Sequence, residues 1–395
     1  MSKPKLDLEG YRAVAAIMVV VFHAYQHNRF GEHYRWPLEG TIWHHVLMHS
    51  DMLVDMFFVL SGFLLGLPYA RAALGETKPK AARAFLLRRA VRLLPLYLVV
   101  VLTVWAMSNP MLPGDWRDLV LHLTFTHVWS DDKIFYTVGP AWTLGVEAHF
   151  YLLLALLGAL AQRHCPPLGS RARRVAAMLA VLAGLAAVSL GYKWWAAYVR
   201  GFPTEAWSAW FNPLAKLDVL VCGMLLAVAS AAGLRWPNFL ARQAVGLLGA
   251  AAVAAGAALR YTSVHPTFSH TFFGIGITLV IAATALSKVR GPWWLRWAPL
   301  VSLSTVSYSL YLWHEPLLRV LDGRGALPAP GDPWAFPVTA AWLLAVSIPI
   351  AYASYHVIEA SADRIMGAFD SAGRPREFYT ALPPVTPARS PGGRM

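Results

Sequence analysis

The sequence predicts an all-α protein, a polytopic bundle of about ten transmembrane helices with both termini in the cytoplasm. Of its 395 residues, 57% are hydrophobic and only 14% are charged, a composition typical of membrane proteins. Apolar runs long enough to cross a hydrocarbon core of about 30 Å recur along most of the chain. Lysine and arginine are concentrated in alternate connecting segments, as in a chain that crosses a membrane repeatedly.

The predicted spans follow one another from residue 10 to residue 357. The seventh is short and consists largely of alanine and glycine. Residues 1–25 have the charged start and apolar centre of a signal peptide, but the nine further spans favour an uncleaved signal anchor. The ten predicted spans are 10–27, 46–69, 93–109, 141–161, 175–193, 209–231, 243–259, 268–287, 300–320 and 336–357.

The distribution of positive charge tests this count. Of the 34 lysines and arginines, 24 fall in the segments that are cytoplasmic if the N-terminus is cytoplasmic. Cytoplasmic loops carry such an excess in membrane proteins. The asymmetry therefore supports ten spans, and it accounts for the net charge of +13 without a nucleic-acid partner.

We expect one membrane domain over residues 1–360, because the sequence shows no internal repeat and no glycine-rich phosphate loop. Residues 361–395 are polar and rich in proline and glycine, which predicts a disordered cytoplasmic tail. Cys165 falls in a cytoplasmic loop and Cys222 within a span, so we expect neither a disulfide nor a metal site.

Two of the outside segments, 26–45 and 110–140, are rich in tryptophan, histidine and acidic residues. They suit either an interfacial aromatic belt or a surface that binds something polar. The aromatic segment 194–211 fits the same pattern.

Ionisable residues inside the spans carry most of the functional information, because a charge at the bilayer centre costs about 2.5–3.5 kcal/mol on insertion scales. Arg12 and His23 are eleven residues apart, which places them on one helix face about 16 Å apart along the axis. The structural explanation is that Arg12 snorkels to the cytoplasmic surface and His23 is a hydrogen-bonded core residue. The functional explanation is that one helix face carries a cation near the cytoplasmic surface and an imidazole about halfway across the membrane.

Three arginines, Arg88, Arg89 and Arg92, precede the third span in "RRAVRLLP". Guanidinium groups bind phosphates through paired hydrogen bonds, so this cluster suits a polyphosphate such as that of coenzyme A. Anchoring by the positive-inside rule explains the same charges. Near the outer end of the second span, Asp55 is either a solvated helix-end carboxylate or a group that orients an imidazole or binds a sugar hydroxyl.

Further ionisable residues occur in the fourth, sixth and ninth spans. Glu147 follows Trp142 by little more than one turn, and Asp218 lies in the sixth span. In the ninth span, Tyr311 and His314 belong to one polar stripe. Several histidines and carboxylates together with a basic cluster exceed what anchoring requires.

The chain resembles acyltransferase family 3, the integral membrane acyltransferases that modify surface glycans and some glycosylated natural products. The resemblance spans residues 8–357, and its blocks occur in family order. They are "LEGYRAVAAIMVVVFH", "VDMFFVLSGFLL", "RRAVRLLPLY", "AWTLGVEAHFYLLLAL", "KLDVLVCGMLLA" and "SYSLYLWHEPLL". Ala148 and His149 replace an acid and a glutamine often found in the family, so His149 is given no role.

The resemblance implies a cytoplasmic-membrane O-acyltransferase that moves an acyl group, most often acetyl, from acyl-CoA to a hydroxyl. The acceptor implied is a glycan, a lipid-linked sugar or a glycosylated metabolite, and membrane lipids surround the protein. His23, Glu147, His314 and Asp55 are then the catalytic candidates, with His23 first as general base or acyl carrier. The donor-binding candidates are Arg12, Arg89, Arg92 and Arg88, and the substrate-binding candidates are Trp142, Tyr311 and Asp218; no metal is expected.

Two other functions fit the same sequence features. A transporter or flippase of a lipid-linked glycan also uses intramembrane histidines and acids, although inverted repeats are not visible in the sequence. A catalytically inert assembly partner would have the same fold. Acceptor identity, acyl length and oligomeric state are open.

Overall fold

The computed structural model describes residues 7–289 and 291–361, and within these ranges the chain is helical and forms no β-strand. The predicted tail, 361–395, lies outside the described residues apart from Ser361. Both cysteines are free, as expected. The α-helices are α1 (Glu9–His27), α2 (Ile42–Met48), α3 (Val54–Ala73), α4 (Ala82–Ser108), α5 (Trp116–Leu123), α6 (Trp142–His164), α7 (Arg171–Trp194), α8 (Trp207–Trp210), α9 (Pro213–Ala231), α10 (Phe239–Leu259), α11 (Thr267–Ala285), α12 (Ala298–Thr305), α13 (Ser307–Gly323) and α14 (Ala335–Ser354).

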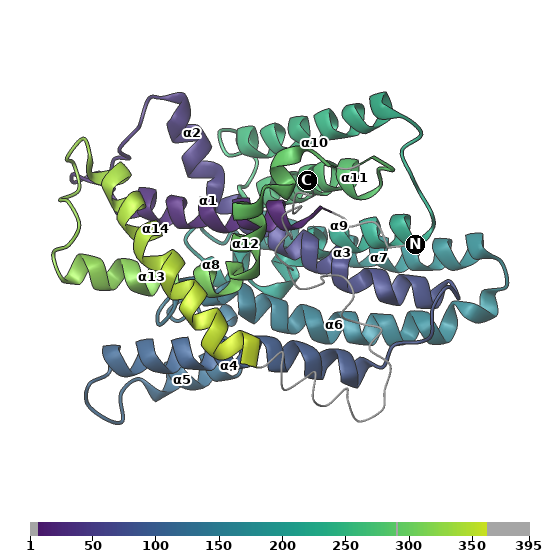
Figure 1. Cartoon of the computed structure of the whole chain (residues 1–395), viewed down its shortest axis with the longest axis horizontal. Helices are drawn as coiled ribbons and strands as arrows, with labels where there is room; N and C mark the ends of the chain where they lie inside the picture. The colour runs from purple at the N-terminus through teal and green to yellow at the C-terminus, as the bar shows by residue number, and fades with distance from the viewer. Residues whose placement is uncertain (1–6, 290, 362–395) are drawn as a thin grey trace, which may run out of the picture.

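The long helices lie side by side in one bundle, with α10 and α11 along one edge and α4 and α5 along the opposite edge (Figure 1). Eight helical segments of the described chain are long and apolar enough to cross a membrane. The protein is therefore a multi-pass membrane protein, as predicted.

The two predicted spans that do not meet those limits are the first and the ninth. The first is α1, which is polar because it contains Glu9, Arg12 and His23. The ninth is interrupted, and its longer part, α13, has only 17 residues. These two helices pack against each other, so protein and not lipid surrounds much of their polar surface.

Several predicted boundaries need correction. The second span is preceded by α2 and a 3₁₀ turn, η1 (His49–Leu53), before α3 begins. α4 begins at Ala82 instead of residue 93, because its first turns are rich in alanine, leucine and arginine, which favour helix. The predicted span 300–320 breaks at Val306, where Ser307 donates its hydroxyl to the carbonyl of Ser304 at 2.8 Å. Such side chains compete with the helical backbone.

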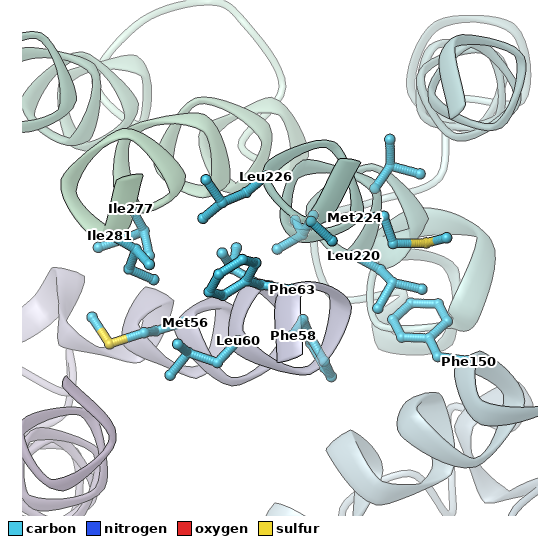
Figure 2. Packing of buried hydrophobic residues seen from close by; sticks show 14 of the residues in the cluster. Met56, Phe58, Leu60, Phe63, Phe150, Leu220, Met224, Leu226, Ile277 and Ile281 are labelled. Carbon is cyan, nitrogen blue, oxygen red and sulfur yellow. The ribbon is translucent and has the colours of Figure 1, made fainter. Parts of the chain in front are cut away.

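Close packing of α3 against α9 sets the centre of the bundle. A Cβ on Gly62 would lie 2.4 Å from the backbone oxygen of Leu220, and one on Gly223 would lie 2.1 Å from that of Val59. Small residues allow this approach in membrane helices. Figure 2 shows the resulting core, with Phe58 and Phe63 of α3 among side chains of α6, α9 and α11.

Candidate active site

Helix α1 presents Arg12 and His23 to α13. Arg12 Nη2 donates to Ser307 Oγ at 3.2 Å, and the His23 ring meets His314 with ring centroids 4.9 Å apart. Both side chains therefore lie on the side of α1 that faces α13. The eleven-residue spacing brings an arginine to one end of this helix pair and an imidazole toward the other.

His23 and His314 form a hydrogen-bonded pair. His314 Nε2 lies 3.1 Å from His23 Nδ1. His314 is buried, whereas His23 is half-buried. The ring of Tyr311, one turn before His314 on α13, has its centroid 5.8 Å from the His314 ring.

The hydrogen-bond partners assign the tautomers of the neutral rings. His314 Nδ1 lies 2.7 Å from the Tyr311 carbonyl oxygen. A carbonyl only accepts, so this Nδ1 carries the proton and Nε2 is the acceptor. His23 Nδ1 lies 2.9 Å from the Val19 carbonyl oxygen and faces the accepting His314 Nε2, so it is the donor. His23 Nε2 therefore keeps its lone pair and is suited to take a proton.

The other end of the site gathers positive charge. Arg12 interacts electrostatically with Arg89 and Arg92 of α4 and with Glu147 of α6. All four side chains are half-buried. Three cations around one carboxylate favour binding of an anion. Arg88, the fourth predicted donor-binding residue, interacts with Tyr69.

Both carboxylate oxygens of Glu147 accept hydrogen bonds from hydroxyl groups. Ser61 donates to Oε1 at 3.1 Å, and Tyr151 donates to Oε2. Glu147 interacts electrostatically with Arg12 and Arg89, so it belongs to the arginine end of the site. Within the described residues, no hydrogen bond joins it to His23. Sequence reasoning missed Ser61 and Tyr151, although both lie within the family-like blocks.

Asp55, predicted beside His23 or the acceptor, lies in a separate buried group that we call the Asp55 cluster: Asp55, Lys216 and His270. His270 Nδ1 donates to Asp55 Oδ2 at 2.6 Å, and Lys216 Nζ lies 3.6 Å from Asp55 Oδ1. In the described chain, no ion pair or hydrogen bond joins Asp55 to His23. Trp142 borders this cluster, with its ring 5.7 Å from Lys216 Nζ.

Asp218 lies in a neighbouring group, the Asp218 cluster: Ser189, Lys193, Asp218 and Thr271. Lys193 Nζ donates to Asp218 Oδ2 at 2.7 Å and to Thr271 Oγ1 at 2.8 Å. Ser189 donates to Asp218 Oδ1 at 3.2 Å. Asp218 thus contacts α7 and α11 instead of the histidine pair.

His270 and Lys193 were not selected from the sequence. Like Arg12 and His23, both are ionisable groups inside apolar spans, a property that often indicates a function. Both lie close to the outer ends of their predicted spans, where polar residues are common and do not by themselves indicate a function. Their partners come from helices distant in sequence, so the clusters appear only in the fold.

The outer segment 110–140 forms α5, the 3₁₀ turn η2 (His127–Trp129) and the loop before α6. His127 stacks on His122 with ring centroids 4.2 Å apart. Burial lowers the pKa of His127 to about 3, so this ring is neutral near pH 7. These two histidines pack the segment against the bundle, which accounts for part of its histidine content by structure alone.

No group of three or more histidine, cysteine or acidic side chains suited to a metal ion occurs in residues 7–289 and 291–361. The residues gathered at the site instead supply two imidazole rings at one end and guanidinium groups at the other. That arrangement is suited to a ligand with an anionic end and a reactive end.

Comparisons with known proteins agree with this chemistry. A family model described as "Acyltransferase domain" matches residues 5–356. "Putative membrane-bound transacylase BcsY" of Komagataeibacter xylinus is 30% identical over 333 residues, which are 80% of this chain and 73% of that protein. "Acyltransferase MdmB" of Streptomyces mycarofaciens is 27% identical over 397 residues, covering 96% of this chain and 95% of the relative.

"O-acetyltransferase OatA" of Staphylococcus aureus strain NCTC 8325 / PS 47 is 25% identical over 351 residues, which are 81% of this chain but 52% of that protein. No solved structure matches significantly.

Proposed function

The chain belongs to the family of membrane acyltransferases whose domain model covers residues 5–356, and from this premise we propose that it is an O-acyltransferase of the cytoplasmic membrane that uses acyl-CoA. Transfer of acyl groups follows from the family. The finer proposal is that the donor acyl group is acetyl and that the acceptor is a hydroxyl of a glycan, a lipid-linked sugar or a glycosylated metabolite. The name of the Staphylococcus relative, an O-acetyltransferase, supports acetyl as the group transferred and an oxygen as the acceptor atom.

One observation carries the proposal: a single helix pair, α1 and α13, joins an imidazole with a free Nε2 to a group of arginines. A coenzyme A thioester has phosphates at one end and its reactive carbonyl at the other. The axial rise between Arg12 and His23, about 16 Å for eleven residues, separates a phosphate site from a reaction site.

In the proposed mechanism, Arg12, Arg89 and Arg92 bind the phosphates of the donor by charge-assisted hydrogen bonds. Glu147, held by hydrogen bonds from Ser61 and Tyr151, offsets part of the mutual repulsion of the arginines.

At the other end, His23 Nε2 takes the proton of the acceptor hydroxyl as its oxygen attacks the thioester carbonyl. The new C–O bond forms, the C–S bond breaks, and the His23 imidazolium returns the proton to the CoA thiolate. His314 Nε2 accepts the hydrogen bond from His23 Nδ1–H, which orients the base and stabilises its cationic form.

His23 is also placed to carry the acyl group itself, if the acyl group moves first to Nε2 and then to the acceptor oxygen. In that route the thiolate leaves as the acyl-imidazole forms, and the acceptor regenerates free His23. Transport without covalent chemistry is no longer proposed, because acyl transfer is the activity of the family.

The test is transfer by purified protein in nanodiscs. Acetyl-CoA labelled in the acetyl group is incubated with a panel of glycans and glycosylated metabolites, and free CoA thiol and labelled acceptor are measured together. We expect thiol release that depends on the acceptor and equals the label incorporated. Absence of both products with every acceptor and acyl-CoA tested would overturn the proposal.

A further inference from the structure

The Asp55 cluster and the Asp218 cluster are neighbours, but only one has complete hydrogen bonding. In the Asp218 cluster, Lys193, Thr271 and Ser189 all donate to the carboxylate. In the Asp55 cluster, Lys216 Nζ and Asp55 Oδ1 are buried and have no hydrogen-bond partner among the described residues. An unsatisfied buried polar group costs about 1–3 kcal/mol, and more when charged.

These open atoms lie where helices α3, α9 and α11 begin. Lys216 is 1% exposed and Asp55 is fully buried. Lys216 Nζ lies over the Phe211 ring at 4.7 Å. His270 Nδ1 is held by Asp55, so in the neutral ring its Nε2 is an acceptor, and that side chain keeps 10% exposure.

A partly exposed rim continues the cluster toward solvent. Arg260 Nη2 donates to Asp51 Oδ2 at 2.7 Å, while Asp51 Oδ1 and Arg260 Nε have no partner among the described residues. Asp51 interacts electrostatically with Lys216, and Arg260 with His270. The next residue, Tyr261, is 57% exposed, and its ring contacts those of His45 and His49.

The same rim adjoins the reaction site. Asp51 lies in η1, which packs against α1, and it interacts electrostatically with His23. The open groups of the rim and of the Asp55 cluster therefore lie at the imidazole end of the site, away from the arginines.

The open atoms include both hydrogen-bond donors and hydrogen-bond acceptors. Lys216 and Arg260 offer N–H groups, whereas Asp51 and Asp55 offer carboxylate oxygens. A phosphate would be repelled by the two carboxylates, and a metal ion by the lysine and arginine. Neutral hydroxyl groups both donate and accept, so they match this surface, and an exposed tyrosine ring suits the apolar face of a sugar.

We propose that the Asp55 cluster and its Asp51–Arg260 rim bind the hydroxyl groups of a saccharide acceptor next to the hydroxyl that is acylated. This inference rests on the proposed function, since it assigns the acceptor side of that reaction. Asp51 and Arg260 contact the sugar directly, and the buried Lys216 and Asp55 bind a hydroxyl that reaches inward.

The test is binding in the absence of turnover. Full-length protein in nanodiscs is titrated with glucose, galactose and N-acetylglucosamine by saturation-transfer difference NMR, and CoA binding is measured in parallel. We expect at least one sugar to bind, with affinity reduced about tenfold or more in Asp51→Asn and in Arg260→Gln, a loss of one charge-assisted hydrogen bond. Arg260→Lys keeps the charge beside Asp51 but removes Nε–H, and it also weakens binding.

Asp115→Asn is the matched control. Asp115 pairs with Lys133 at 2.6 Å, with side-chain exposures of 28% and 16%, against 26% and 17% for Asp51 and Arg260. It should bind the sugar as wild type does, and unchanged CoA binding shows that each variant is folded. No sugar binding by wild type, or equal binding by wild type, Asp51→Asn and Arg260→Lys, would overturn the subsite. The acyltransferase proposal stands or falls separately, on acceptor-dependent release of CoA.

Discussion

The two buried charge clusters of the bundle use similar residues in similar surroundings and differ in completeness. Each contains one aspartate and one lysine, on helices that pack through small residues and apolar side chains. In the Asp218 cluster every side chain has a partner, whereas in the Asp55 cluster two polar atoms, Asp55 Oδ1 and Lys216 Nζ, have none among the described residues. A buried group that is fully hydrogen-bonded stabilises the fold, but one left open costs free energy unless a ligand completes it.

The comparison predicts that the two lysines differ in their effect on stability. Lys193→Met leaves Asp218 buried without its cation, and we expect the free energy of unfolding to fall by about 3–5 kcal/mol. Lys216→Met should cost clearly less, because Asp55 keeps its hydrogen bond from His270 and the lost ammonium group had no hydrogen-bond partner in the described chain. Reversible unfolding in mixed micelles measures both. Equal losses for the two variants would remove the distinction between the clusters.

At the arginine end of the site, in contrast to the two clusters, several side chains of the same charge lie close together. Arg89→Gln or Arg92→Gln removes one charge-assisted phosphate contact, worth about 1.5–3 kcal/mol. We expect KM for acyl-CoA to rise about tenfold or more, with a smaller change in kcat. Steady-state kinetics at saturating acceptor measure this effect.

Arg83→Gln is the control for that experiment, because Arg83 lies on the same helix but is exposed. It should leave KM for acyl-CoA unchanged. If Arg89→Gln and Arg92→Gln behave like Arg83→Gln, the arginines only anchor the helix at the membrane surface.

The Lys133–Asp115 ion pair, which is partly exposed, shows how much less such a pair contributes to stability than a buried one. The hydrogen bond between Lys133 and Asp115 lowers the pKa of Asp115 and raises that of Lys133. The Asp115 contribution is present above its unfolded pKa and is lost as pH falls through the lower folded value, and the Lys133 contribution is lost as pH rises through its raised value.

Lys133→Met should therefore lower stability by less than about 1 kcal/mol near neutral pH, with the difference from wild type shrinking as pH falls toward 3. Thermal unfolding between pH 3 and pH 8, a range set by the ordinary aspartate pKa of about 3.9, measures it. A loss as large as that of Lys193→Met would mean that burial does not separate the two pairs.

Sequence periodicity and hydropathy predicted the helical membrane bundle, because lipid-facing helices such as α10 must be apolar. The same criterion is weakest for α1 and α13, the helices that hold His23 and His314, since a functional helix exchanges apolar surface for polar groups covered by protein. The break at Val306 was missed because local serine hydrogen bonds, not composition, end α12.

For the site, helix spacing predicted the shared face of Arg12 and His23, whose side chains both contact α13. Spacing within one helix cannot give contacts between helices. Asp55 was expected to orient His23 or the acceptor hydroxyl, and the side chains it contacts are His270 and Lys216. Glu147 likewise lies among the arginines, tied by Ser61 and Tyr151. The catalytic and binding roles themselves are predictions.

The central claim is that His23 is the base or the acyl carrier of the transfer reaction, and one comparison tests it most directly. His149 is the matched histidine: it is half-buried on α6, and its Nδ1 contacts the Gly145 carbonyl oxygen at 2.7 Å, as His23 Nδ1 contacts that of Val19. At equal abundance in nanodiscs, His23→Ala should reduce kcat for acetyl transfer by about 10²-fold or more, with CoA binding intact, while His149→Ala remains near wild type. Retained turnover in folded, CoA-binding His23→Ala would contradict the account.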